Sequence, residues 1–239
     1  MYGTIGLWLI VTFLIMGEPI IGVLAYKRLR AGTVTRMRMY RLTLVQEWFL
    51  VGLAMAIFLA DRVPLRNIGL GIGHYSALSG AFSGLVSGLI FGVVVTMALS
   101  ILSARRKIRT ISMRHPIRIG NFDFLLPSNR SEHWTFAWVA ITAGICEEIL
   151  FRVLVIYVLQ HQFPSLSWGM IVAITALIFG MAHLYQGWRG IVGTGLLGSV
   201  FAIIYLTTGS ILLPILIHIL LNMRGLVLTN ERSHRNVEM

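Results

Sequence analysis

The sequence has few charged residues, few acidic residues and only one cysteine. Asp, Glu, Lys and Arg make up 12% of its 239 residues, whereas a soluble domain usually has about a quarter. This shortage excludes an ordinary soluble domain. The single cysteine, Cys146, excludes an intramolecular disulfide. There are 9 acidic against 20 basic residues, which gives a formal net charge of +11.

Apolar residues dominate what remains. They make up 56% of the chain, and the mean hydropathy is +0.80. Runs of roughly 20 apolar residues, long enough to cross a bilayer as helices, repeat along the whole chain. We therefore expect an all-α fold, a polytopic transmembrane helical bundle that forms a single integral membrane domain over residues 1–239. About seven spans are predicted: 3–25, 43–60, 80–102, 134–159, 167–184, 190–207 and 211–228. A short interfacial helix within 122–134 would be an eighth.

Most basic residues lie in short segments between the predicted spans. This arrangement is typical of topology signals and of contacts with lipid headgroups, and it does not indicate a nucleic-acid partner. Since Lys and Arg in short loops are retained in the cytoplasm, the N-terminus should lie outside and the C-terminus inside.

One predicted span, in the stretch "GICEEILFRVLVIYVLQ", contains three ionisable residues. A charged side chain at the centre of a bilayer costs about 2.5 to 3.5 kcal/mol, so each needs a partner or a wet cavity. Glu148 and Arg152 are one helical turn apart and can pair within their own helix. Glu147 then has no basic residue three or four positions away, and its partner must come from another helix.

Two other predicted spans contain candidate partners. His183 lies near the end of the span at 167–184, whereas His218 and Asn222 are one turn apart in the span at 211–228. Packing all three polar patches around one interior site would satisfy them together. A carboxylate can act as general base, a histidine can relay the proton, and N–H groups can stabilise an oxyanion. This set suits attack of water on a carbonyl.

Three ordered motifs identify the chain as similar to a known family. Glu147, Glu148 and Arg152 fit EExxxR, Phe179 and His183 fit FxxxH, and His218 and Asn222 fit HxxxN. The chain resembles the CPBP family of CAAX proteases and bacteriocin-processing proteins, also called Abi, to which the type II CAAX prenyl endopeptidase belongs. The resemblance covers the region from 134 to 228.

The resemblance implies an intramembrane glutamic endopeptidase, a hydrolase that cleaves membrane-associated or lipid-anchored peptides without a cofactor. Glu147 would activate water with help from His183, and His218 with Asn222 would stabilise the oxyanion. The site would be supported by Glu148, Arg152 and Phe179. The compact length fits a prokaryotic member in the inner (cytoplasmic) membrane. The substrate, its prenylation and the oligomeric state stay open.

Two other functions remain open. Two histidines and a glutamate can form a catalytic zinc site, although no H-E-x-x-H helix is present. A non-catalytic immunity or scaffold protein could instead use the polar cluster to bind a partner. We interpret Cys146 as a packing residue rather than a nucleophile. We expect Glu18 and Glu47 to reach loop arginines rather than the site.

Overall fold

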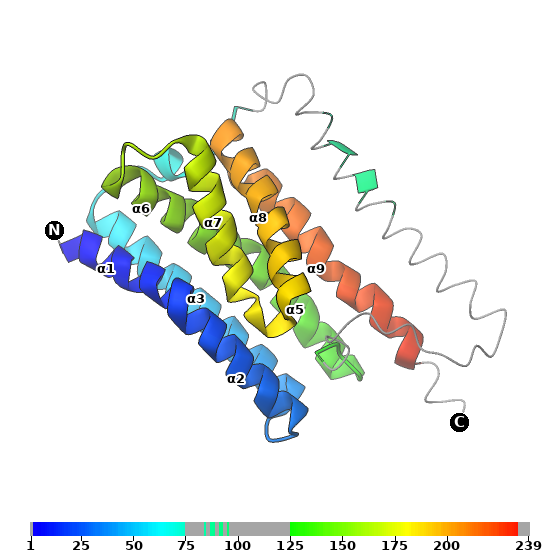
Figure 1. The fold of residues 1–239 in the computed structure, drawn as a ribbon. Coiled ribbons are helices and arrows are strands. Elements are labelled where there is room, and N and C mark those ends of the chain that lie inside the picture. Colours follow the sequence, from blue (N-terminus) through cyan, green and yellow to red (C-terminus); the bar gives the residue numbers. More distant parts are fainter. Residues whose placement is uncertain are drawn as a thin grey trace.

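The computed structural model describes residues 2–74 and 125–233, together with a few isolated positions between 84 and 95. Within this part of the chain every regular element is helical, and none is a strand. Figure 1 shows the helices as one elongated bundle. The all-α prediction is therefore confirmed for the described residues.

The first helical stretch is longer than predicted. α1 (Tyr2–Thr12), the π-helix η1 (Phe13–Gly17) and α2 (Glu18–Arg30) follow one another without a break. α3 (Arg36–Ala60) begins seven residues before the predicted Thr43, because the Thr35 hydroxyl caps it by accepting a hydrogen bond from the Arg38 N–H at 3.3 Å. The short 3-10 helix η2 (Leu65–Ile68) follows α3. Basic residues at the C-terminal end of α2 and at the N-terminal end of α3 thus extend these helices beyond the apolar spans.

The later helices contain the motif residues, except that His183 lies in a short turn between two of them. α5 (Arg130–Glu148), the π-helix η5 (Ile149–Leu154) and α6 (Val155–Gln162) form a continuous stretch. The Asn129 side chain caps α5 by accepting a hydrogen bond from the Glu132 N–H. α7 (Trp168–Ala182), the 3-10 helix η6 (Leu184–Gln186), α8 (Trp188–Thr208) and α9 (Leu212–Ser233) complete the described fold.

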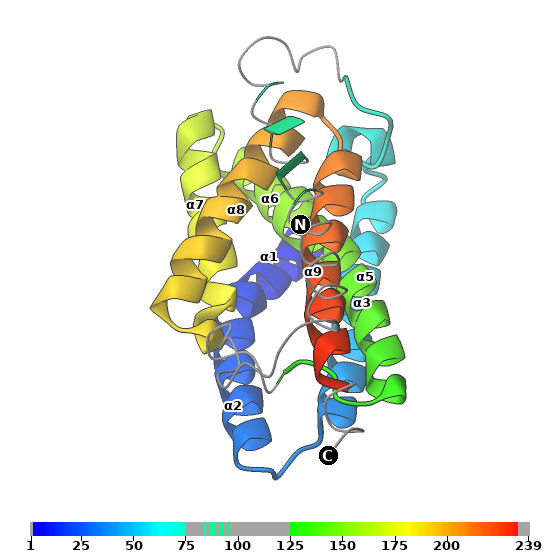
Figure 2. The same cartoon turned by 90° about the vertical axis from the view of Figure 1, so that its right-hand side faces the viewer.

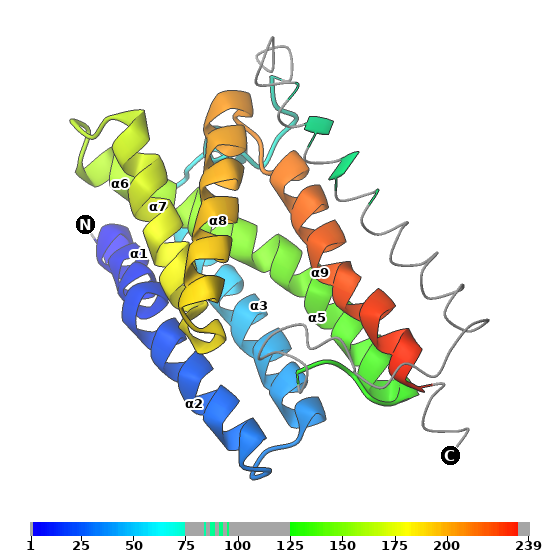
Figure 3. The same cartoon turned by 45° about the vertical axis from the view of Figure 1, so that its right-hand side comes forward.

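Close contacts at glycines set the spacing between the helices that contain the motif residues. A Cβ at Gly144 of α5 would lie 2.4 Å from Ile219 of α9, and a Cβ at Gly180 of α7 would lie 2.7 Å from the Ile191 carbonyl of α8. Figures 2 and 3 show both pairs, α5 with α9 and α7 with α8, side by side. The small residues therefore let these backbones approach closely.

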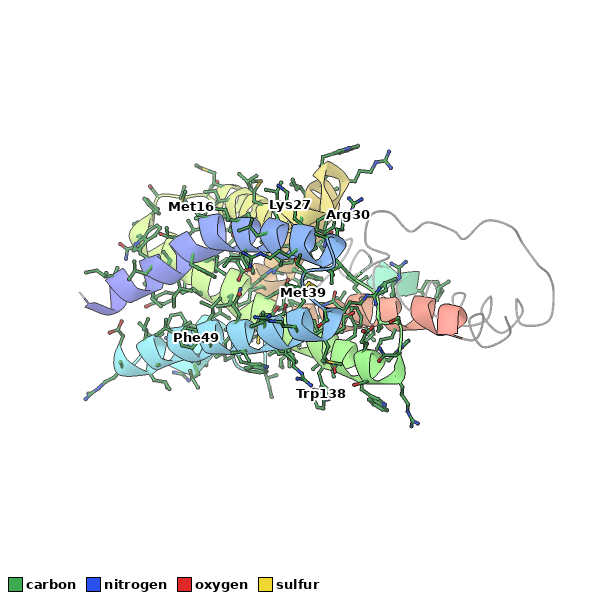
Figure 4. The ribbon with its side chains drawn as sticks, turned by 90° about the horizontal axis from the view of Figure 1, so that it is seen from below. Met16, Lys27, Arg30, Met39, Phe49 and Trp138 are labelled. Carbon is green, nitrogen blue, oxygen red and sulfur yellow. The ribbon has the colours of Figure 1, made fainter. Side chains whose placement is uncertain are left out.

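The outer surface suits contact with lipid. The stretches Gly3–Arg30, Arg36–Ala60 and Trp188–Thr208 are long and apolar enough to cross a membrane, and α7 and residues 212–226 of α9 are shorter apolar helices. Large apolar side chains such as Met16 and Trp138 are 61% and 62% exposed and point outward in Figure 4. The chain is thus a helical membrane protein.

The count of seven spans is not established. The predicted span at 80–102 falls mostly outside the described residues. Of the proposed interfacial helix within 122–134, residues 122–124 also fall outside them, and residues 125–129 form a turn that leads directly into α5.

The basic segments gather at one end of the bundle. In Figure 1 the loop after α2, the start of α5, η6 and the C-terminal end of α9 all lie at the lower end. Lys27 and Arg30, labelled in Figure 4, mark this end of α2. An Arg36–Glu132 ion pair of 3.6 Å connects α3 to the start of α5 here. We call this end of the bundle the basic end.

We predict that Gly180→Ala destabilises the protein by about 1–3 kcal/mol, because its Cβ would meet the Ile191 carbonyl. Gly169→Ala is the matched control, since it lies in the same helix with nothing within 4 Å of its Cβ. Thermal unfolding of both variants in one detergent, followed by circular dichroism, measures the difference. Equal melting temperatures would show that α7 and α8 are not in close contact.

Candidate active site

A buried ion pair occupies the centre of the site. The Arg152 Nε lies 3.1 Å from the Glu148 Oε2, and both side chains are 0% exposed. The pair predicted from the spacing of four residues is therefore confirmed. Breaking such a pair leaves an uncompensated charge, which costs about 3–5 kcal/mol.

Aromatic rings cover the other faces of the arginine. The Arg152 guanidinium carbon lies 4.3 Å from the ring centroid of Phe179 and 5.2 Å from that of Phe201. An Arg152 Nη2–H also donates to the Gly198 carbonyl at 3.5 Å. Ring faces attract cations, so these contacts stabilise the positive charge of Arg152, which Glu148 also neutralises. Phe179 also lies 4.8 Å from the ring of His183.

Glu147 points elsewhere, towards two histidines. Its Oε2 lies 3.9 Å from the His183 Nε2 and 3.8 Å from the His218 Nε2. These separations are too long for direct hydrogen bonds, and within the described residues this buried oxygen has no hydrogen-bond partner. The structure thus brings Glu147, His183 and His218 together from α5, the end of α7 and α9.

Hydrogen bonds on the far side of each ring orient both histidines. The His183 Nδ1 lies 2.9 Å from the Phe179 carbonyl, and the His218 Nδ1 lies 2.8 Å from the Glu148 Oε1. Because these oxygens only accept, each Nδ1 carries a proton and donates it. In a neutral ring the Nε2 then presents its lone pair towards Glu147. The bond from His218 to Glu148 was not foreseen, and it couples the ion pair to the histidine.

Asn222 lies one turn beyond His218 on α9. Its amide Nδ2 donates to the Ala140 carbonyl of α5 at 3.4 Å, which is longer than usual for such a bond. Ala140 precedes Glu147 by two helical turns. In the described residues no hydrogen bond connects Asn222 to Glu147 or to either histidine, so Asn222 stands at the edge of the group.

Two π-helices lie next to intramembrane glutamates. η5 begins directly after Glu148 and contains Arg152, whereas η1 ends directly before Glu18. A π-turn widens the helix and turns the side chains that follow it, and such turns are frequent at functional sites. Sequence patterns do not reveal these turns, because the apolar residues on either side look alike.

Among the described residues, the prediction for Glu18 and Glu47 does not hold. Within this part of the chain neither glutamate forms a salt bridge with an arginine, and Glu18 accepts a hydrogen bond from the Gln46 Nε2 at 2.6 Å. The charges of both Glu18 and Glu47 interact with that of Glu147. The basic residues lie at the helix ends, whereas these two glutamates lie on inward faces closer to the middle.

Tyr185 of η6 separates this region from an open pocket at the basic end. Its ring lies 6.1 Å from that of His183. Val23, Lys27 and Arg30 of α2 also line the pocket. Burial raises the pKa of Tyr185 to about 12, so the phenol stays neutral at cellular pH.

The residues present can transfer protons but do not form a recognisable metal cage. Among the described residues, no group of three or more His, Cys, Asp or Glu side chains is arranged to hold a metal ion. Cys146 is buried and belongs to the apolar core. Two imidazoles and an unpaired carboxylate in a poorly solvated setting are suited to general acid–base chemistry.

Fold and site together define a helical membrane protein with two glutamates, two histidines and an arginine gathered in its interior. Residues 129–224, from the cap of α5 into α9, match the family model described as type II CAAX prenyl endopeptidase, Rce1-like. This region contains all three motifs, and its match agrees with the resemblance to CAAX proteases that the motifs indicated. The chain has no significant match among curated proteins or among solved structures.

We predict that Arg152→Met destabilises the protein by about 3–5 kcal/mol, because Glu148 would remain as a buried unpaired charge. Adding Glu148→Gln should recover most of this loss, since the amide is neutral and still offers an oxygen to His218. Thermal unfolding of the single and double variants measures the recovery. Equal destabilisation of the single and the double variant would show that the unpaired charge of Glu148 is not the cause of the lost stability.

Proposed function

We propose that the protein is an intramembrane endopeptidase in which Glu147 activates water for attack on a peptide carbonyl. The observation that supports it best is the Glu147 Oε2, which is buried, unpartnered among the described residues and within 4 Å of two imidazole nitrogens. Gaps of 3.8 and 3.9 Å suit a water molecule that contacts all three groups.

The proposed reaction balances without a cofactor. Water gives one proton to the Glu147 carboxylate, and the hydroxide forms a bond to the carbonyl carbon of the scissile peptide. The resulting tetrahedral oxyanion collapses, the carbon–nitrogen bond breaks, and the proton held by Glu147 passes to the leaving amine. The products are a carboxylate and an amine.

The two histidines contribute differently because their Nδ1 partners differ. His218 donates to the Glu148 carboxylate, so a positively charged ring is stabilised there. His183 donates to a neutral carbonyl and suits a proton relay beside Glu147. In this proposal His218 enters the reaction with a proton on its Nε2 as well, so that this N–H donates to the oxyanion, and Asn222 joins it by exchanging its long bond to Ala140.

The substrates we propose are peptides held at the membrane, including lipid-anchored ones. Their scissile bonds would reach the site from the basic end, where His183 lies between α7 and η6. In the orientation inferred from the basic segments this end faces the cytoplasm. The prokaryotic inner membrane is the proposed location.

We predict that Glu147→Gln lowers cleavage at least 100-fold, because the amide cannot take a proton from water. Purified wild-type and variant proteins, reconstituted in lipid nanodiscs, are incubated with a proteome-derived peptide library, and new termini are identified by mass spectrometry. Asp61→Asn, an exposed change at the far end of α3, is the matched control and should cleave like the wild type. New termini in equal yield from Glu147→Gln would contradict the proposal.

Zinc catalysis, the alternative that the residue types allow, makes a different prediction. We expect cleavage to survive prolonged chelation and dialysis, because Glu147 and the histidines act directly on water. The wild-type protein is assayed before chelation, after it, and after addition of Zn²⁺. Loss of cleavage on chelation with recovery on Zn²⁺ would replace the glutamate mechanism by the zinc mechanism.

A further inference from the structure

Glu18, Glu47 and Glu147 form an acidic group that we name the carboxylate cluster. They come from three helices, α2, α3 and α5, and their charges act on one another. Like charges on three carboxylates in a poorly solvated interior would repel one another. Such an arrangement needs a reason beyond packing.

The helix faces place Glu47 inside the bundle. Tyr40, Glu47 and Ala54 are spaced by seven residues and so share one face of α3, and Tyr40 and Ala54 are 3% and 0% exposed. The Trp48 indole N–H donates to the Thr142 hydroxyl at 3.2 Å and fixes α3 against α5. Glu47 therefore faces the segment of α5 that leads to Glu147.

Glu18 faces the same interior from α2. Gly22, one turn later, packs against Tyr185, with its Cβ position 3.1 Å from the tyrosine ring. Glu18 also accepts a hydrogen bond from Gln46, the neighbour of Glu47. Glu18 thus lies between α3 and the end of α7, where His183 begins the connection to η6.

A carboxylate oxygen of the carboxylate cluster accepts no hydrogen bond from the described residues. The Glu47 Oε2 is fully buried and has no hydrogen-bond partner among the described residues. Among the described residues, the arginines that form salt bridges are Arg36 and Arg152, and they pair with Glu132 and Glu148 rather than with the cluster. A buried acceptor of this kind is costly unless a donor reaches it, and a cationic donor would also relieve the repulsion.

We infer that Glu47, with Glu18, forms a subsite that receives the basic side chain of a Lys or Arg residue next to the scissile bond. This inference rests on the proposed function, because it places the substrate's cation beside Glu147. A long side chain of this kind has an apolar stem that suits the membrane interior and a terminal donor that suits Glu47. The protein would therefore prefer substrates with a basic residue close to the cleavage site.

The first arm of the test uses the peptide library described above. Wild-type protein should yield termini that depend on Glu147, with Lys or Arg enriched at one position within three residues of the cleaved bond. Absence of Glu147-dependent termini would overturn the proposed function. Glu147-dependent termini without basic enrichment would overturn the subsite alone.

The second arm compares two synthetic peptides built on a cleaved sequence, one with Lys at the enriched position and one with norleucine, which keeps the stem and removes the charge. The wild type should prefer the Lys peptide in kcat/KM by about 10 to 100-fold, the range of a hydrogen bond to a charged group. Glu47→Gln should reduce this ratio to near one, Glu47→Asp should retain part of it, and Asp61→Asn should leave it unchanged. Because both peptides meet the same preparation, the ratio is independent of the folded fraction.

An unchanged ratio in Glu47→Gln would overturn the subsite, since the cation would then bind elsewhere. An equal loss of kcat/KM on both peptides, with the ratio preserved, would do the same and would assign Glu47 to positioning of Glu147.

Discussion

The ion pair between Glu148 and Arg152 is the constraint on which the site depends. It is fully buried, and α7 and α8 provide the aromatic rings and the carbonyl that hold the arginine. Since Glu148 also accepts the proton of the His218 Nδ1, the same pair fixes α9. Three parts of the bundle are therefore positioned by one charge pair, and Glu147, the preceding residue on the helix, has no arginine or lysine partner among the described residues.

The two adjacent glutamates therefore have different surroundings: Glu148 belongs to the ion pair, and Glu147 faces the histidines. Neighbours on a helix point about 100° apart, so the first carboxylate can face the histidines while the second remains in the ion pair. Close approach at Gly144 and Gly180 brings the histidine-bearing segments near enough. The π-turn η5 begins where the two carboxylates end. Together these features hold an unpaired acid inside a membrane protein. Such an acid is energetically costly there, and intramembrane acids of this kind usually mark functional sites.

Much of this could be predicted from sequence, but not all of it. The charge of Glu148 needed a partner one turn away, and Arg152 was the available one, so spacing was sufficient. The motifs likewise led to the family that residues 129–224 match. Spacing could not show that His218 bonds to Glu148, because that contact joins residues 70 positions apart. The prediction for Glu18 and Glu47 failed because distance from the loops along the sequence did not show which face each residue occupies. The span predicted at 80–102 falls mostly outside the described residues.

The central claim is that the Glu148 carboxylate is held in an ion pair with Arg152, whereas the Glu147 carboxylate is free to react. A hydrophobic carbodiimide, which reacts with accessible carboxyl groups in membrane interiors, tests this claim without any knowledge of the substrate. Reconstituted protein is labelled, digested and mapped by tandem mass spectrometry, with Glu147→Gln and Glu148→Gln variants to assign the adduct between the adjacent residues. We expect the adduct on Glu147 and none on Glu148. Labelling of Glu148 with Glu147 unmodified would contradict the account.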